Sequence, residues 1–443
     1  MLKYSRYNHM VKIPDEDAYA LLNFRTGAFA RLSPLQKDLF EVAADLDENS
    51  SKVKKFRRGG FLVSYDELRH MRTQAYMASG WGRVLGLTIC PTMACNFACP
   101  YCFEEQRSGR MSKETEENVV KFAERFLERL PCQDMGVSWF GGEPLLCPDI
   151  IESLSEKLMA LADKKNCGYH ARIVTNGWFL TSEIVTMLER VKVVDMQITL
   201  DGPTPETNDH LRREKNGGSS FARIIKNLEN LHTKKIKVML RCNLNHENAL
   251  LFPRLKEKIT AIAKQNGFAV RVYPAYMDGE LKESSQAAGI ALSMEAFSNL
   301  VGGWDDVQDP MQKESYAVPT FCMAQNINGF AIDEQGYLYK CWEAIGYGAK
   351  SFGNVRDFDI LRESEGDMGA WDAYFETLFP ESDRECMDCK VFPVCKGGCP
   401  HKRLLGKRTC LPLKYDLDGY VLNRYRIWKK GQDKQGRRED EAP

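Results

Sequence analysis

Apolar and polar positions in the first part of the chain predict a small domain of strands and helices. Three short apolar stretches have the composition of strands: Tyr7–Ile13, Ala18–Asn23 and Ala28–Leu32. Ser33 then has the position of an N-cap, with Pro34 at the first helical position and apolar residues recurring at helical spacing behind it. We expect residues 1–83 to form a small α+β domain that can offer a sheet edge.

From Arg83 onward, apolar stretches typical of strands alternate with amphipathic helices. The predicted strands are Val84–Cys90, Gly136–Phe140, Ala171–Thr175, Val194–Leu200, Val238–Asn243 and Ala269–Tyr273. The predicted helices are Lys113–Arg129, Pro148–Lys165, Ser182–Arg190, Phe221–His232 and Ala249–Gln265. This alternation is typical of parallel βαβ units and predicts an α/β protein. Six strands predict a partial (β/α)6, TIM-like barrel over residues 84–275, with its chemistry at the carboxyl ends of the strands.

The loop after the first of these strands carries closely spaced cysteines. Cys95, Cys99 and Cys102 are spaced C-x-x-x-C-x-x-C. Three thiolates with these gaps can bind three corners of an iron–sulfur cube and leave the fourth iron without a protein ligand. Tyr101 precedes the last cysteine, where its ring could lie against a planar ligand. The triplet alone is also compatible with half of a zinc site or with three buried thiols.

Polar and glycine-rich motifs follow the next three strands. The candidate site residues there are Gly141, Gly142, Glu143, Thr175, Asn176, Thr199, Asp201 and, slightly downstream, Arg212. The glycines let backbone approach a ligand closely, and Glu143 offers a carboxylate. Arg212 is either a cation of the site or a solvated surface charge. Arg241 and Asn243 would also face the site if the register of the fifth strand is right.

Together these motifs resemble those of radical S-adenosylmethionine (radical SAM) enzymes. The cysteine triplet resembles the family's cluster loop, and Gly141–Pro144 matches its G-G-E-P motif. Thr175–Gly177 resembles T-N-G, and Thr199–Pro203 resembles S-L-D-G-P with Thr in place of Ser. The resemblance implies a 4Fe–4S cluster that holds SAM for cleavage to a 5′-deoxyadenosyl radical. It also implies contacts from Glu143 to the SAM ammonium, from the residue-199 hydroxyl to the ribose and from Arg212 to the carboxylate.

Seven further cysteines lie in the tail. They are Cys322, Cys341, Cys386, Cys389, Cys395, Cys399 and Cys410. A C-x-x-C pair would by itself suggest a zinc ribbon, but seven cysteines are too many for one tetrahedral site. With Gly336 five positions before Cys341 and gaps of two, five and three residues from Cys386 to Cys399, residues 321–415 resemble the SPASM extension of radical SAM enzymes. That resemblance implies two auxiliary 4Fe–4S clusters and therefore three clusters in all.

The resemblance also divides the tail cysteines between the two auxiliary clusters. The distal cluster would take Cys386, Cys389, Cys395 and Cys410, and the nearer cluster would take Cys322, Cys341 and Cys399. Fully ligated relatives have one more cysteine shortly before the position of Cys322, where this chain has none. We therefore expect an open iron on the nearer cluster, to which a substrate thiolate could bind. Water, a nearby side chain or an irregular ligand is the alternative.

The two ends of the chain are less specific. Residues 1–83 resemble, in layout, the winged-helix-like domain with which peptide-modifying radical SAM enzymes recognise a precursor peptide, whose leader adds a strand to the sheet. The alternative is a capping domain that only packs on the catalytic one. Residues 276–320 are expected to be a connection with a weak helix at Ser293–Val301. Residues 416–443 are expected to be a helix followed by a disordered tail from Lys429.

Composition restricts the classes of partner. A chain of 443 residues is long enough for two or three domains. Lys and Arg balance Asp and Glu at 61 each, which gives no electrostatic reason to expect nucleic acid or a membrane surface as a partner. No apolar run approaches the roughly 18 residues of a membrane helix, and the polar start is not an export signal. Fifteen cysteines without such a signal predict a reducing compartment, the cytoplasm.

The combined resemblance predicts an oxidoreductase that modifies a ribosomally made (RiPP) precursor peptide, as thioether-forming sactisynthases and ranthipeptide synthases do. Carbon–carbon crosslinking of a peptide, or sulfatase-type formation of formylglycine, is the alternative within catalysis. A non-catalytic iron–sulfur electron carrier is the alternative of another class, but such a protein has no need of the G-G-E-P and L-D-G-P positions. The expected partners are a precursor peptide and an electron donor such as flavodoxin or ferredoxin.

Overall fold

The computed structural model describes residues 2–80, 82–277, 289–302, 322–359 and 368–440. Its contacts divide the chain into two compact units. Unit 1 comprises Met1–Ser79, Met294–Phe321 and Glu376–Pro443, and unit 2 comprises Gly80–Ser293 and Cys322–Phe375. The front of the chain and most of the tail cysteines therefore belong to one unit, whereas the sequence pattern assigns them to separate segments. Much of the predicted connection 276–320 lies outside the described residues.

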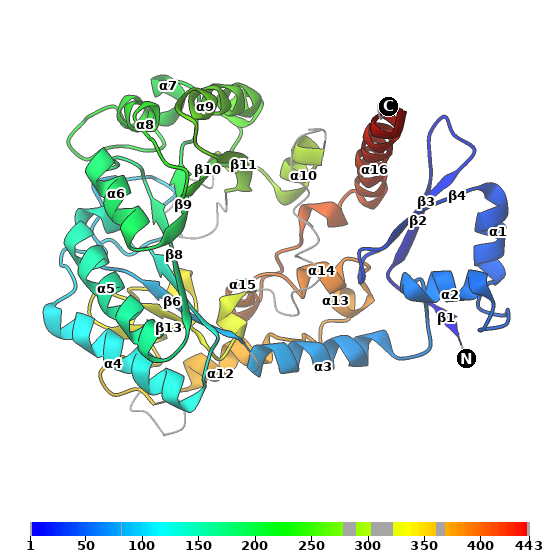
Figure 1. The fold of residues 1–443 in the computed structure, drawn as a ribbon, viewed down its shortest axis with the longest axis horizontal. Helices are drawn as coiled ribbons and strands as arrows, with labels where there is room; N and C mark the ends of the chain where they lie inside the picture. Colours follow the sequence, from blue (N-terminus) through cyan, green and yellow to red (C-terminus); the bar gives the residue numbers. More distant parts are fainter. Residues whose placement is uncertain (1, 81, 278–288, 303–321, 360–367, 441–443) are drawn as a thin grey trace. The chain divides into compact units, whose positions relative to one another are not determined.

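A mostly parallel sheet forms the centre of unit 2 (Figure 1). Its parallel strands are β6 (Val84–Ile89), β7 (Asp134–Trp139), β8 (Gly168–Thr175), β9 (Val193–Thr199), β10 (Lys237–Leu244) and β11 (Val270–Tyr276). They lie side by side in sequence order, and each pairs in parallel with the next. This confirms the predicted α/β fold with a parallel sheet. The sheet is open, and its carboxyl ends are collected along one edge.

Helices connect successive strands of this sheet. They are α4 (Lys113–Arg129), α5 (Pro148–Lys164), α6 (Ser182–Arg190), α7 (Pro205–Asn208), α8 (Ser220–Glu229) and α9 (Phe252–Asn266). Three of them begin at a side-chain N-cap, where Ser112, Thr181 and Ser219 accept a hydrogen bond from the backbone of the first turn. Their apolar residues are buried, which explains why the amphipathic pattern predicts most of their boundaries closely.

Three short strands extend the sheet beyond β6. Strand β12 (Gly329–Ile332) pairs in parallel with β6, and β13 (Tyr337–Tyr339) and β14 (Gly353–Asn354) follow in antiparallel order. The tight turn between β12 and β13 uses Gly336, whose φ of 84° favours glycine. The sequence pattern did not predict these strands, because segments of two to four residues carry too little periodicity.

Arg107 joins this extension to the loop that follows the cysteine triplet. Its Nε donates to Glu334 at 2.7 Å and its terminal nitrogens donate to Asp333 at 2.9 Å and to the Gly346 carbonyl oxygen at 3.0 Å. The side chains of Asp333 and Glu334 are 0% and 4% exposed. Two buried carboxylates would be costly without a partner, so one guanidinium stabilises both.

Unit 1 contains an antiparallel sheet of β2 (Asn8–Lys12), β3 (Tyr19–Asn23) and β4 (Phe29–Leu32), in that order. The other front elements are β1 (Lys3–Tyr4), which pairs with β5 (Leu62–Val63), and the helices α1 (Pro34–Val42), α2 (Ser51–Arg58) and α3 (Glu67–Gly80). Successive residues of β3 face opposite sides: Leu21 packs with Phe40, whereas Leu22 belongs to a core that also contains Phe392 and Cys395. The front sheet and the cysteine-rich tail therefore share one hydrophobic core.

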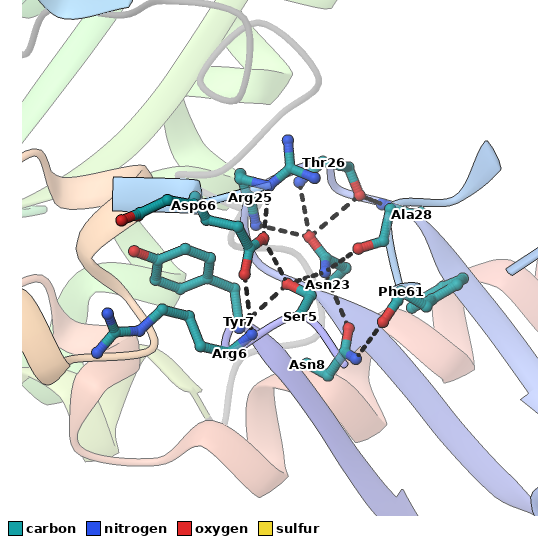
Figure 2. A network of polar contacts seen from close by, with 12 residues as sticks. Ser5, Arg6, Tyr7, Asn8, Asn23, Arg25, Thr26, Ala28, Phe61 and Asp66 are labelled. Atoms are coloured by element: carbon teal, nitrogen blue, oxygen red, sulfur yellow. Dashed lines mark hydrogen bonds and ion pairs between the residues drawn. The ribbon is translucent and has the colours of Figure 1, made fainter. Parts of the chain in front are cut away.

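A buried asparagine stabilises the front of unit 1 (Figure 2). Asn23 Nδ2 donates to Ser5 Oγ at 2.9 Å and to Asn8 Oδ1 at 2.8 Å. Asn23 Oδ1 accepts hydrogen bonds of 3.0 Å from the backbone amides of Arg25 and Thr26. The Asn23 side chain thus fixes the β3–β4 turn and the segment that leads into β2. Its amide nitrogen and its amide oxygen are both hydrogen-bonded, as expected for a buried polar group.

The described tail consists of short helices and one long one. They are α10 (Met294–Gly302), α12 (Met368–Glu376), α13 (Arg384–Asp388), α14 (Phe392–Cys395), α15 (Pro400–Leu404) and α16 (Leu417–Asp440). Helix α16 corrects the expectation of a disordered tail from Lys429, because Lys, Arg and Gln sustain a helix without apolar periodicity. Among the helices of the described residues, none has the length and apolar character of a membrane span.

Replacing Arg107 by Met should destabilise unit 2 by about 3 kcal/mol, because the variant leaves buried carboxylates without their cation. The matched control is Arg110→Met, since Arg110 pairs with Asp149 and both side chains are more than half exposed. That variant should cost less than about 1 kcal/mol. Urea unfolding followed by tryptophan fluorescence measures both. An equal loss of unfolding free energy in the two variants would contradict the stabilising role of Arg107.

Candidate active site

The two glycines after β7 bring the β7 loop against the backbone of the cysteine loop. A Cβ on Gly141 would lie 2.3 Å from the Thr92 carbonyl oxygen, and one on Gly142 would lie 2.2 Å from that of Ala94. Gly141 also has a φ of 113°, which favours glycine. The backbone amide of Glu143 donates to the Ala94 carbonyl oxygen at 2.8 Å. The sequence led us to expect that Gly141 and Gly142 let the backbone approach a ligand. In the structure, their Cα atoms instead pack against the backbone of the cysteine loop and so position the cysteines.

Glu143 links the ends of β7 and β8. Its carboxylate is fully buried and accepts hydrogen bonds from the Leu145 amide at 3.0 Å, the Thr175 hydroxyl at 2.7 Å and the Asn176 amide at 2.7 Å. Burial raises the pKa of Glu143, and these three donors act in the opposite direction. Thr175 and Asn176 therefore lie beside Glu143, as their positions at neighbouring strand ends predict.

Asn176 also contacts the cysteine loop. Its Nδ2 donates to Asn96 Oδ1 at 2.7 Å and lies 3.9 Å from Cys95 Sγ. The backbone amide of Phe97 is 3.3 Å from the same sulfur. Asn96 Nδ2 is buried and has no hydrogen-bond partner among the described residues. A buried donor without a partner beside the cysteines is available to a polar ligand.

Tyr101, Asp201 and Arg212 form a buried polar cluster. The Tyr101 hydroxyl donates to Asp201 and accepts from Arg212 at 2.8 Å, and the Arg212 guanidinium lies 3.9 Å from the Asp201 carboxylate. Arg212 also lies over the Phe97 ring at 5.4 Å. Its burial contradicts the alternative of a solvated surface charge. Arg212 Nε lacks a partner among the described residues, so this guanidinium retains a donor for an anion.

Asp201 in turn connects β9 with β10. Its carboxylate accepts from the Asn243 amide at 2.8 Å, and its own amide donates to Asn208 Oδ1 at 2.9 Å. Asn248 Nδ2 donates to the Asp201 carbonyl oxygen at 2.8 Å. Thr199 is the last residue of β9 and is buried beside this network. Burial raises the pKa of Asp201, while Arg212 acts in the opposite direction.

Sequence reasoning missed several of these supporting residues. Asn96 lies between two of the cysteines, and Asn248 follows β10 in a loop without a motif. Asn208 stands in the Asn-Asp-x-x-Arg segment that ends at Arg212, and its amide also donates to Ser220 at 2.9 Å. That segment was the available signal for Asn208. No spacing rule could have found the other two, because Asn96 bonds to Asn176 and Asn248 bonds to Asp201, and both of these partners are distant in the sequence.

The three cysteines of the loop lie close enough together to influence one another. Burial raises the pKa of the Cys95 thiol to about 12, and the charges of Glu143, Cys99 and Cys102 act in the same direction. Burial likewise raises the pKa of Cys99 to about 11. Thiols in this state need a bound cation to hold them as thiolates. Their proximity and the amide donors around Cys95 fit a cluster with one thiolate on each of three irons.

The tail cysteines are distributed between the two units. Cys322 and Cys341 precede short turns of 3-10 helix in unit 2, and the other five lie in unit 1. Within unit 1, Cys389, Cys386 and Cys410 contribute to raising the pKa of Cys395 to about 11, after burial as the main cause. The four cysteines of the expected distal set therefore lie near one another. Among the described residues, no three His, Cys, Asp or Glu side chains are arranged so that they could hold a single metal ion.

Beside Cys341, Lys340 is fully buried in unit 2. Its ammonium donates to the Gly329 carbonyl oxygen at 2.7 Å and lies 4.2 Å from the Trp371 ring centroid. Burial lowers the pKa of Lys340, and Cys322 acts in the opposite direction. The Lys340 side chain thus holds the segment that carries Cys341 through a backbone carbonyl oxygen and an aromatic ring.

Several curated proteins are similar in sequence to this chain. The mycofactocin maturase of Mycobacterium tuberculosis is 34% identical over 143 residues, which span 32% of each chain and thus about a third of that relative. The mycofactocin maturase of Mycolicibacterium smegmatis is 27% identical over 347 residues, 73% of this chain and 79% of the relative. The cysteine-type anaerobic sulfatase-maturating enzyme of Clostridium perfringens is 23% identical over 366 residues, 76% and 94% of the two chains.

The fold and the cysteine loop can now be assigned to a family. A solved structure of anSMEcpe with bound AdoMet and Cp18Cys peptide shares the fold, with a TM-score of 0.55, 21% identity and coverage of 78% of this chain and 98% of that one. The family profile described as radical SAM superfamily matches residues 89–265, which include the cysteine triplet and the three strand-end motifs that follow it. Residues 89–265 of this chain therefore form a radical SAM domain.

Proposed function

We propose that this enzyme cleaves SAM at a 4Fe–4S cluster held by Cys95, Cys99 and Cys102 and modifies a ribosomally made peptide by forming a cysteine thioether. The observation that carries the first part is the convergence of the cysteine loop with the ends of β7, β8 and β9. The cluster and SAM, when bound, supply a 5′-deoxyadenosyl radical. Every other step below concerns groups of this chain and of the peptide.

Residues of the chain would hold SAM by complementary charge and hydrogen bonding. Arg212 is fixed by Tyr101 and Asp201 and retains an unpaired Nε, which suits a carboxylate. Asn96 keeps an unpaired amide donor beside Cys95. The Tyr101 ring lies at the strand end where a planar base would pack, and the Thr199 hydroxyl would bind the ribose. The backbone of the Gly141–Pro144 motif and the Glu143 carboxylate would contact the ammonium, since the carboxylate accepts three hydrogen bonds and has room for a fourth.

The tail would carry two auxiliary 4Fe–4S clusters. The four-cysteine group Cys386, Cys389, Cys395 and Cys410 supports the distal one, because these thiols interact within unit 1. Cys322 and Cys341, which both lie in unit 2, would belong to the nearer one, for which the cysteine count leaves one iron open. In the proposed reaction the peptide loses one hydrogen atom from carbon, and its cysteine loses a proton and an electron as the carbon–sulfur bond forms. A flavodoxin or ferredoxin would supply the electron that starts SAM cleavage.

The front domain would bind the leader of the precursor peptide. Strands β2 and β4 are the two edges of its three-stranded sheet, and an extended peptide can add to such an edge. Leu22 and Phe24 of this front sheet share a hydrophobic core with Cys395, so the sheet and the distal cysteines lie in the same unit. A leader bound at this sheet would be held on the same compact unit as the distal cysteines.

A second function is favoured by the sulfatase-maturating relatives. Such an enzyme acts on a sulfatase, as its name states, and a reaction of that type would convert a cysteine or serine of this enzyme's substrate into formylglycine. The two functions give different products. A thioether removes a thiol without removing sulfur, whereas formylglycine formation from cysteine removes the sulfur.

Iron content tests the number of clusters. The anaerobically reconstituted chain should contain about twelve irons, because three cubes hold four each. The variant Cys95→Ala/Cys99→Ala/Cys102→Ala and the variant Cys386→Ala/Cys389→Ala should each contain about eight. Cys167→Ala, at a buried cysteine outside both sets, is the matched control and should match the wild type. About four irons in the wild-type chain would rule out both auxiliary clusters.

The product of the reaction tests the proposed bond. The enzyme should be incubated with SAM, a reductant and any short cysteine-containing peptide that is encoded next to its gene. Each thioether should lower the peptide mass by two hydrogen atoms and protect one cysteine from alkylation, and fragmentation should retain the sulfur. A product whose cysteines all still alkylate would exclude thioethers and favour carbon–carbon crosslinking. A product that has lost sulfur would favour formylglycine.

A further inference from the structure

Two cationic side chains contact sulfur atoms of the distal cysteine group. Arg403 donates to Cys386 Sγ at 3.2 Å, and Lys414 lies with its Nζ 3.4 Å from Cys410 Sγ. All four residues belong to unit 1. Each cation therefore reaches a different member of the set Cys386, Cys389, Cys395 and Cys410.

Both cations are held in place by other partners. Arg403 donates to the Gly397 carbonyl oxygen at 3.2 Å and to Asp383 at 3.0 Å. Lys414 donates to Glu385 at 2.7 Å. Side chains fixed in this way keep their N–H groups directed at the sulfur atoms without a further loss of conformational entropy.

The local charge is positive. Residues 390–415 contain seven Lys and Arg residues and no Asp or Glu: Lys390, Lys396, Lys402, Arg403, Lys407, Arg408 and Lys414. Among the ion pairs of the described residues, the three cations Arg403, Arg408 and Lys414 pair with two carboxylates, those of Asp383 and Glu385. The positive charges of this described network therefore exceed its negative charges by one.

We propose that Arg403 and Lys414 are positioning residues that stabilise the reduced state of the distal cluster and so make it an electron acceptor. A cluster with four thiolates becomes more negative on reduction, so hydrogen bonds to its sulfurs and nearby positive charge favour the reduced form. This inference rests on the proposed auxiliary clusters. It adds a role to them: the distal cluster is poised to take the electron that leaves the peptide when the carbon–sulfur bond forms.

Lys414→Met is the main test, because Lys414 lies at the edge of the network. At a fixed potential, the ratio of reduced to oxidised distal cluster should fall about tenfold, which equals about 59 mV for a one-electron couple. Lys414→Arg should restore most of the ratio. The matched control is Arg408→Met, which removes a cation whose guanidinium is bound to the carboxylates of Asp383 and Glu385 rather than to a cysteine sulfur. Its shift should be much smaller, since that side chain is nearly half exposed and screened by solvent.

The measurement is an equilibrium redox titration of the full-length holoenzyme followed by electron paramagnetic resonance. The distal signal is the one that disappears in Cys389→Ala. Arg403→Gln tests the Cys386 side separately and should lower the ratio as well, so a failure of one variant to fold leaves the other decisive. Iron content is measured for every variant.

Three results would count against the inference in different ways. Unshifted potentials in Lys414→Met and Arg403→Gln, with full iron content, would overturn the role of the two cations and leave the clusters in place. Equal shifts in Lys414→Met and Arg408→Met would show that only overall charge matters and would also overturn it. A wild-type enzyme without any signal that depends on Cys389 would overturn the proposed distal cluster itself.

Discussion

The buried carboxylate of Glu143 holds the active-site edge of unit 2 together. A carboxylate removed from water costs several kcal/mol unless hydrogen bonds replace its hydration. Here the replacements come from Leu145, Thr175 and Asn176, which lie after two neighbouring strands. The parallel order of the sheet brings these strand ends together, and Asn176 extends the connection to Asn96 in the cysteine loop. The position of the three cysteines therefore depends on this one side chain.

Asp201 serves the next two strands in a similar way. It receives the Tyr101 hydroxyl from the cysteine loop and the Asn243 amide from β10, and it lies beside Arg212. The loop is thus tied at one side through Asn176 and at the other through Tyr101. Such double attachment suits a site that must hold a cofactor against a cluster, because geometry is fixed before the ligand arrives.

The sequence predicted the elements whose signals are local. Helices Lys113–Arg129 and Ser182–Arg190 were predicted with the observed boundaries, because a capping residue and an amphipathic pattern coincide there. Strand β12 was missed because four residues become a strand only by pairing with β6. The helical end of the chain was missed for the opposite reason, since its sequence lacks the apolar face on which the prediction relied. Asn248 carries no signal, since its role arises from contacts with Asp201 across the fold. The shared core of Phe24 and Cys395 joins segments about as distant as the chain permits, which no spacing pattern describes.

The central claim is that Cys95, Cys99 and Cys102 form a site at which SAM is cleaved. Quantifying 5′-deoxyadenosine after anaerobic incubation with SAM and dithionite tests it most directly. We expect the wild-type enzyme to form 5′-deoxyadenosine and Cys99→Ala to form none, while Cys389→Ala retains cleavage because its cysteine belongs to the distal set. Absence of 5′-deoxyadenosine from a wild-type enzyme that contains its full iron, or formation of equal amounts by Cys99→Ala, would contradict the claim.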